Sequence, residues 1–145
     1  MSAATIKAAI KAHLDDLVTA GTLAGASSSD LKKNPLAADI PGSPWAYLMP
    51  PGIESEASDN RTNIRTYVYD IMVIWNAENI TDDTTVETCL EAVLDEFDND
   101  PTLNGTAMGG ILPVSSAPQP FQHGGKDLIM ANVQIQAKQF VSLTF

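Results

Sequence analysis

The residues of this 145-residue chain that most readily bind metals or move protons are its two histidines. His13 lies in a segment with helical spacing, and His123 lies in a segment rich in Gly and Pro. His13 and Asp16 stand three positions apart, but a lone pair at this spacing is far more often a surface contact than a metal site. Apart from this pair, neither histidine has a Cys, Asp or second His at ligand spacing. We therefore expect no metal ligands.

Motifs for nucleotide or nucleophile chemistry are incomplete. A phosphate-binding loop ending in Gly125 and Lys126 would need Gly at position 120 and Ser or Thr at 127, where the chain has Pro120 and Asp127. Cys89 falls on the apolar stripe of a predicted helix, so we expect a buried small hydrophobic residue. We predict no enzymatic activity, no catalytic or cofactor-binding residues and no cofactor. A small acidic ligand-binding or enzymatic domain is the least favoured alternative.

The net charge of −10 limits the partners of the chain. Phosphate binding needs clustered Lys and Arg, and there are only eight, with none between Thr66 and Gly125. This argues against general adhesion to nucleic acid. One predicted helix carries an acidic stripe, made of Glu87, Glu91, Asp95 and Asp98. The stripe is either a solvated helix face or a surface toward a basic partner or a passage for DNA.

The segment from Ile64 to Trp75 predicts a strand that is covered on both faces. Its odd-numbered residues form one apolar face, and Val68, Met72 and Ile74 make the opposite face apolar too. The amphipathic helix predicted after it, at 84–98, can cover only one face. A neighbouring subunit is a natural candidate for covering the other face.

The remaining elements follow from periodicity and from Gly and Pro. We expect an amphipathic helix from Ala3 to Ala20, a short strand from Trp45 to Met49, and a broken extended segment from Thr106 to Ser115. The last strand, Leu128 to Leu143, alternates apolar and polar residues. The order of elements is α-β-β-α-β-β. The length predicts a single domain over residues 1–145.

Two polar segments beside the long strands, Ile53–Asn63 and Gln119–Lys126, are predicted to be exposed loops. We expect them to be mobile in a free subunit and to become ordered against neighbours. The candidate contact residues on and beside them are Glu54, Glu56, Arg61, Arg65, Gln122, His123 and Lys126.

The predicted length of the two long strands constrains the shape of the molecule. At about 3.3 Å per residue, 64–75 and 128–143 span about 40 and 53 Å, whereas a compact domain of this size is about 38 Å across. Such strands must bend, twist strongly or project toward another molecule.

The order of these elements resembles the tail terminator, or tail completion, proteins of long-tailed bacteriophages. The resemblance runs from Ile6 to Val141 and includes the short strand "WAYLMPPG", the long strand "RTYVYDIMVIW", the helix "TTVETCLEAVLDEFDND" and the following "PTLNG". It implies an α+β fold, with a twisted and mostly antiparallel sheet of about four strands and two main helices packed on one face.

The resemblance also implies a function in assembly. Proteins of that family form a hexameric ring that ends the tail tube, meets the head connector or head-completion protein, and lets DNA pass without specific binding. The expected location is the virion, at the tail end or neck, after synthesis in the host bacterial cytoplasm. We expect no secretion signal and no membrane association. A tail-tube or head-closure subunit is the main alternative.

Overall fold

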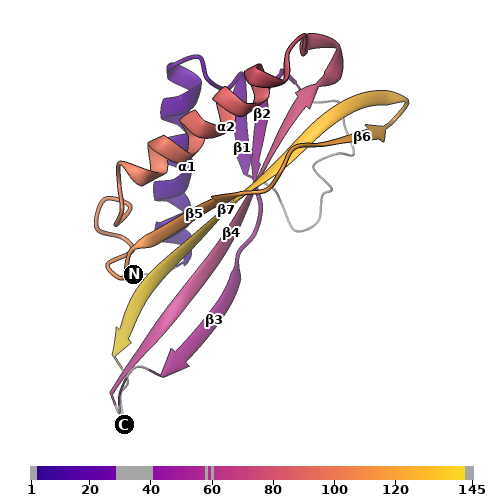
Figure 1. The fold of residues 1–145 in the computed structure, drawn as a ribbon. Helices are drawn as coiled ribbons and strands as arrows, with labels where there is room; N and C mark the ends of the chain where they lie inside the picture. The colour runs from indigo at the N-terminus through magenta and orange to yellow at the C-terminus, as the bar shows by residue number, and fades with distance from the viewer. Residues whose placement is uncertain (1–2, 29–40, 58, 60, 143–145) are drawn as a thin grey trace.

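Two helices and a seven-stranded sheet make up most of the described part of the chain (Figure 1). The computed structural model describes residues 3–28, 41–57, 59 and 61–142. The elements, in chain order, are α1 (Ala3–Thr19), β1 (Gly25–Ser28), β2 (Trp45–Leu48), β3 (Gly52–Ala57), β4 (Thr62–Asn76), the 3-10 turn η1 (Ala77–Asn79), α2 (Asp83–Asp98), β5 (Ile111–Ser115), β6 (Gln119–His123) and β7 (Lys126–Ser142).

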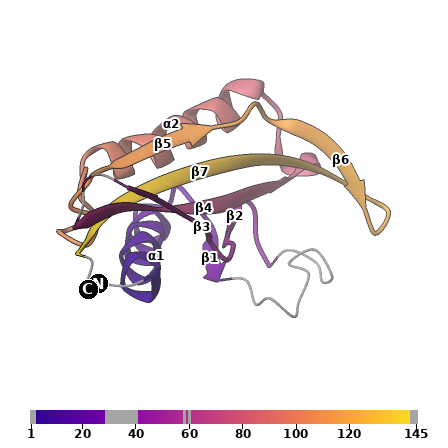
Figure 2. The same cartoon turned by 90° about the horizontal axis from the view of Figure 1, so that it is seen from below.

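The centre of the sheet is the antiparallel pair of β4 and β7. Their register is unbroken from Thr62 opposite Ser142 to Asn76 opposite Leu128. The strand order is β1-β2-β4-β7-β5, while β3 pairs with the first part of β4 and β6 pairs with the first part of β7. Among the strand pairs of the described residues, only β1 and β2 are parallel. Both long strands bow along their length, and their ends extend past the helices (Figures 1 and 2).

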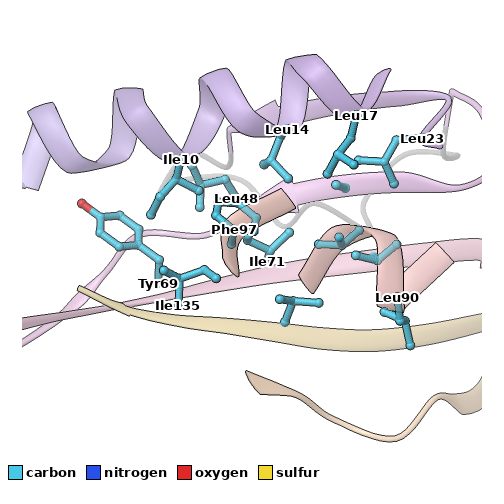
Figure 3. Packing of buried hydrophobic residues seen from close by; sticks show 14 of the residues in the cluster. Ile10, Leu14, Leu17, Leu23, Leu48, Tyr69, Ile71, Leu90, Phe97 and Ile135 are labelled. Carbon is cyan, nitrogen blue, oxygen red and sulfur yellow. The ribbon is translucent and has the colours of Figure 1, made fainter. Parts of the chain in front are cut away.

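The two helices and one face of the sheet share a single hydrophobic core (Figure 3). Leu14 of α1 and Phe97 of α2 are fully buried together with Ile71 of β4. Because side chains alternate along a strand, the other odd-numbered residues of the buried part of β4 belong to the same core. These residues are Tyr67, Tyr69, Val73 and Trp75.

The opposite face of the sheet, which we call the open face, carries the even-numbered residues of β4 and β7. A second, smaller cluster covers one end of it, where Tyr47, Ile74 and Leu128 are buried. Farther along the same face, Ile64 and Val68 are only half-buried, and Phe140 is exposed. The chain itself therefore covers part of the second face of β4 and leaves the rest open.

The number and order of strands differ from the sequence prediction. The four predicted strands correspond to β2, β4, β5 and β7, but β1, β3 and β6 are additional, so the order is α-β-β-β-β-α-β-β-β. The predicted loops Ile53–Asn63 and Gln119–Lys126 are largely β-hairpins. Every residue of β3 is exposed, so its sequence lacks the alternation of apolar and polar residues that marks a strand with one buried face.

The helix ends are set by local hydrogen bonds. The spacing of Thr84 and Glu87 in the sequence matches a capping box, but the N-cap of α2 is Asp82, whose side chain accepts a hydrogen bond from the Thr84 N–H. At the end of α1, Gly21 has a φ of 82°, a left-handed conformation that favours Gly. No helix among the described residues is long and apolar enough to cross a membrane.

The open face provides a matched test of where stability resides. Ile71→Ala removes a fully buried side chain from the core and should lower the free energy of unfolding by about 2–5 kcal/mol. Ile64→Ala, in the same strand but half-buried on the open face, should cost clearly less. Urea denaturation of the free subunit measures both changes. Equal losses would contradict the assignment of the core to the helix-covered face.

Candidate functional site

The seven predicted contact residues lie on two separate hairpins. Four are on the hairpin of β3 and β4, and they are Glu54, Glu56, Arg61 and Arg65. Three are on the hairpin of β6 and β7, and they are Gln122, His123 and Lys126. The turn of the first hairpin lies beside the end of β7, and the turn of the second lies at the beginning of β7, so about 50 Å of strand separates the two turns. The structure therefore forms two candidate contact sites at opposite ends of one ribbon (Figure 1).

The β3–β4 hairpin is held by its turn. The Asp59 carboxylate accepts hydrogen bonds from the backbone N–H groups of Arg61, at 2.8 Å, and Thr62, at 2.7 Å. Glu54 and Glu56 stand opposite Thr66 and Ile64, which places these carboxylates over the open face. Among the described residues β3 pairs only with β4, so this hairpin has an open outer strand edge beside exposed acidic and basic side chains.

The β6–β7 hairpin turns at two glycines. Gly124 and Gly125 have φ values of 60° and 77°, and a two-residue turn with both φ angles positive strongly favours Gly. Gln122 Nε2 donates a hydrogen bond to Asp127 Oδ1 at 2.8 Å across the hairpin. The exposed His123 pairs with Lys126 beside the turn.

The edge of β5 is poorly suited to pairing with a further strand. The Lys138 N–H donates to the Gly110 carbonyl, and the Ser116 N–H donates to the Asn132 carbonyl. The backbone N–H and C=O groups of the even-numbered residues of β5 therefore point toward β7. The backbone N–H and C=O groups of the odd-numbered residues between them then point toward the outer edge of the sheet. Among them, Pro113 has no N–H and breaks the row of donors. The β3 edge has no proline within Gly52–Ala57.

The acidic stripe of α2 points away from the core. Glu87, Glu91, Asp95 and Asp98 are all exposed. The buried side of the same helix consists of Val86, Cys89, Leu90, Val93 and Phe97. The structure thus places all four carboxylates on one accessible surface, and Glu87 at its start borders a surface pocket that Pro120 of β6 also lines.

A row of polar side chains crosses the middle of the open face. Asp70 Oδ1 accepts hydrogen bonds from Asn132 Nδ2, at 3.0 Å, and from Gln134 Nε2, at 3.4 Å, while Gln136 Nε2 donates to Gln134 Oε1. Asn132 Oδ1 is buried and has no hydrogen-bond partner among the described residues. Sequence reasoning identified the polar side of β7 but not its connection to Asp70, which depends on the register of two strands 62 positions apart.

Exposed apolar side chains flank this polar row. On β5, Leu112 is 55% exposed and Val114 is 49% exposed, and both stand opposite the glutamines of β7. On β7, Phe140 is 56% exposed. The open face is therefore a mixed surface, with a polar centre and apolar borders.

His13 has two hydrogen-bond partners that its spacing in the sequence did not indicate. Its Nδ1 lies 3.0 Å from Glu96 Oε1, and its Nε2 lies 2.6 Å from Asp100 Oδ2. Burial lowers the pKa of His13, but the hydrogen bonds and negative charge of Glu96 and Asp100 outweigh that effect and raise the pKa above its ordinary value. The hydrogen bond from the Asn104 N–H, together with His13, lowers the pKa of Asp100. Sequence spacing could not reveal this cluster because its partners are 83 and 87 positions away.

Cys89 borders a surface pocket of about 370 Å³ between α2 and the loop after α1. Its Sγ is 3.7 Å from the Thr22 carbonyl oxygen, and burial raises the pKa of the thiol to about 11. None of the described residues that line this pocket is charged. The arrangement provides an inert thiol.

Comparisons with known proteins bear on the fold. No protein-family model matches the sequence, and no curated protein matches it. Among solved structures, 28 chains match. One belongs to the "Virion of native gene transfer agent (GTA) particle"; it is 19% identical, with a TM-score of 0.55, over 91% of this chain and 92% of that chain. The two proteins share a fold over nearly their whole lengths.

The state of Cys89 can be measured directly. With a pKa of about 11, roughly one thiol in a thousand is ionised at pH 8, so a thiol-specific disulfide reagent should react about 100-fold more slowly than with an ordinary cysteine. Unfolding in guanidinium should restore full reactivity. Fast modification of the native subunit would contradict the buried, raised-pKa thiol.

Proposed function

We propose that this chain is a structural virion protein without enzymatic activity. In this proposal it forms a closed ring of six subunits that ends the tail tube of a phage-like particle and joins it to the head connector. The DNA passes through the ring without specific binding. The particular role of tail terminator rests on the sequence resemblance described above.

The observation that carries the proposal is the fold likeness to a chain of a virion. That likeness covers 91% of this chain, so it includes most of the long β4–β7 ribbon. At 19% identity it supports a virion component and indicates no position within the particle. A tail-tube or head-closure subunit has the same support from the fold.

The ends of the ribbon support contacts between subunits. Each end carries an exposed hairpin that extends beyond the helices (Figure 1). In the proposed ring, one hairpin contacts a different surface of the next subunit in a head-to-tail manner, which is a heterologous contact. Heterologous contacts close into a ring when the rotation between subunits closes.

The charge of the chain supports a passage for DNA. The net charge of −10 and the exposed stripe of Glu87, Glu91, Asp95 and Asp98 would repel phosphates. A lumen with this character would let DNA slide without adhering. We propose the stripe as the lumen surface or as the contact with a basic partner.

The first prediction of this proposal concerns mass. Light scattering at micromolar concentration should give a particle of about six times the 15.4 kDa subunit mass. Glu54→Lys combined with Glu56→Lys reverses the charge of the exposed β3 strand and should shift the particle toward the monomer without unfolding it. Glu78→Lys, an exposed glutamate outside both hairpins, is the matched control and should leave the mass unchanged.

Two results would count against the ring. A monomeric mass in solution, together with a single copy in the assembled particle, would contradict it outright. An unchanged mass in the Glu54 and Glu56 double variant would remove the β3–β4 hairpin from the contact.

The second prediction concerns the acidic stripe. Glu91→Gln with Asp95→Asn removes repulsion between residues one helical turn apart, and each such like-charged pair costs about 0.2–0.5 kcal/mol. The free energy of unfolding should therefore stay equal or rise by a few tenths of a kcal/mol. Particle assembly and infectivity should fall. If both are unchanged while stability rises, the stripe is only a solvated helix face.

A further inference from the structure

We propose that His13, Asp16 and Glu96 bind a divalent transition-metal ion of the Zn²⁺ type, which joins α1 to the C-terminal part of α2. This inference is independent of the proposed ring. It rests on the position of the three donors, on the hydrogen bond made by the other nitrogen of His13, and on the types of the three ligands.

The donor atoms are close enough to share one ion. One ligand atom from each of His13, Asp16 and Glu96 lies within 4.8 Å of the other two. Around a tetrahedral Zn²⁺ with bonds of about 2.0–2.2 Å, ligand atoms lie about 3.3–3.6 Å apart. Rotation of the exposed Asp16 side chain can shorten the distances from its carboxylate to the other two donors. The side chains of His13 and Glu96 are already half-buried.

Both helices hold the donors in place. His13 and Asp16 are three positions apart on α1, which places them on the same side of the helix. Glu96 lies in the last turn of α2, and the His13 ring packs in a T-shaped arrangement with the ring of the next residue, Phe97, at 5.4 Å between centroids. The core therefore fixes the histidine ring next to the second helix.

The second nitrogen of His13 already has the partner that metal-binding histidines favour. Such a histidine usually donates its remaining ring N–H to a carboxylate, which sets the tautomer and the ring orientation. His13 Nε2 is 2.6 Å from Asp100 Oδ2, and the other oxygen of Asp100 accepts the Asn104 N–H at 2.8 Å. This leaves Nδ1, on the side of Glu96, as the metal-binding atom.

The ligand types indicate the class of ion. Imidazole suits Zn²⁺ and related transition metals, whereas Mg²⁺ and Ca²⁺ prefer oxygen ligands alone. One nitrogen and two carboxylates leave a coordination position for water, as in zinc sites with three protein ligands. Without a metal, the same contacts suit an imidazolium between Glu96 and Asp100, and that arrangement does not require Asp16.

A metal site requires Asp16 and an ion pair does not, and the experiment tests this difference. Protein stripped of metal by a chelator and dialysed at pH 7.5 is titrated with Zn²⁺, and the unfolding temperature is measured. At 100 times the Kd, Zn²⁺ should raise Tm by about 5–10 °C. Co²⁺ used as a spectroscopic probe should change its visible absorption when bound.

The variants separate the metal site from the ion pair. Asp16→Asn should weaken Zn²⁺ binding at least tenfold and leave the metal-free Tm nearly unchanged, because no hydrogen bond of the His13 ring involves Asp16. His13→Gln should abolish the Co²⁺ spectrum. Asp15→Asn, the adjacent exposed carboxylate on α1, is the matched control and should keep full binding.

Two results would overturn the site. One is the absence of any Zn²⁺-dependent shift in the unmodified protein, which would leave an ion pair only. The other is an equal shift in the unmodified protein and in Asp16→Asn, which would place the metal elsewhere.

Discussion

The structure depends on the antiparallel pairing of β4 with β7. Every other strand except β1 attaches to one of these two, and the register between them is continuous from Thr62 to Asn76. Since side chains alternate along each strand, one face of this ribbon packs in the core and the opposite face is the open face. Both helices occupy the first face, and the length of the ribbon carries its ends beyond them (Figure 2).

Sequence reasoning succeeded where burial leaves a periodic pattern. The alternation in β4 and β7 and the apolar stripes of α1 and α2 follow from contact with one core, so these elements could be predicted. β3 and β6 could not, because they are almost entirely exposed and form through pairing with β4 and β7. Pro120 in β6 and the exposed residues of β3 are typical of loops, although the backbones of both segments pair with β7 and β4.

The candidate site residues also differ in whether a local sequence pattern could indicate them. Glu54, Glu56 and Lys126 were chosen as candidate contacts because they lie in polar segments beside long strands. They lie on exposed hairpins, and their role in contacts stays a prediction. The contacts of His13 and Asp70 were missed because they join residues more than 60 positions apart. Only the packing of α1 on α2 and the register of the sheet bring those groups together.

The central claim is that the exposed ends of the ribbon join this subunit to its neighbours. Hydrogen exchange of backbone amides, compared between the free subunit and the assembled particle, tests it most directly. The account predicts new protection in β3 and β6, while the amides of the α1 and α2 core stay equally protected in both states. New protection confined to the helices, with unchanged exchange in both hairpins, would contradict it.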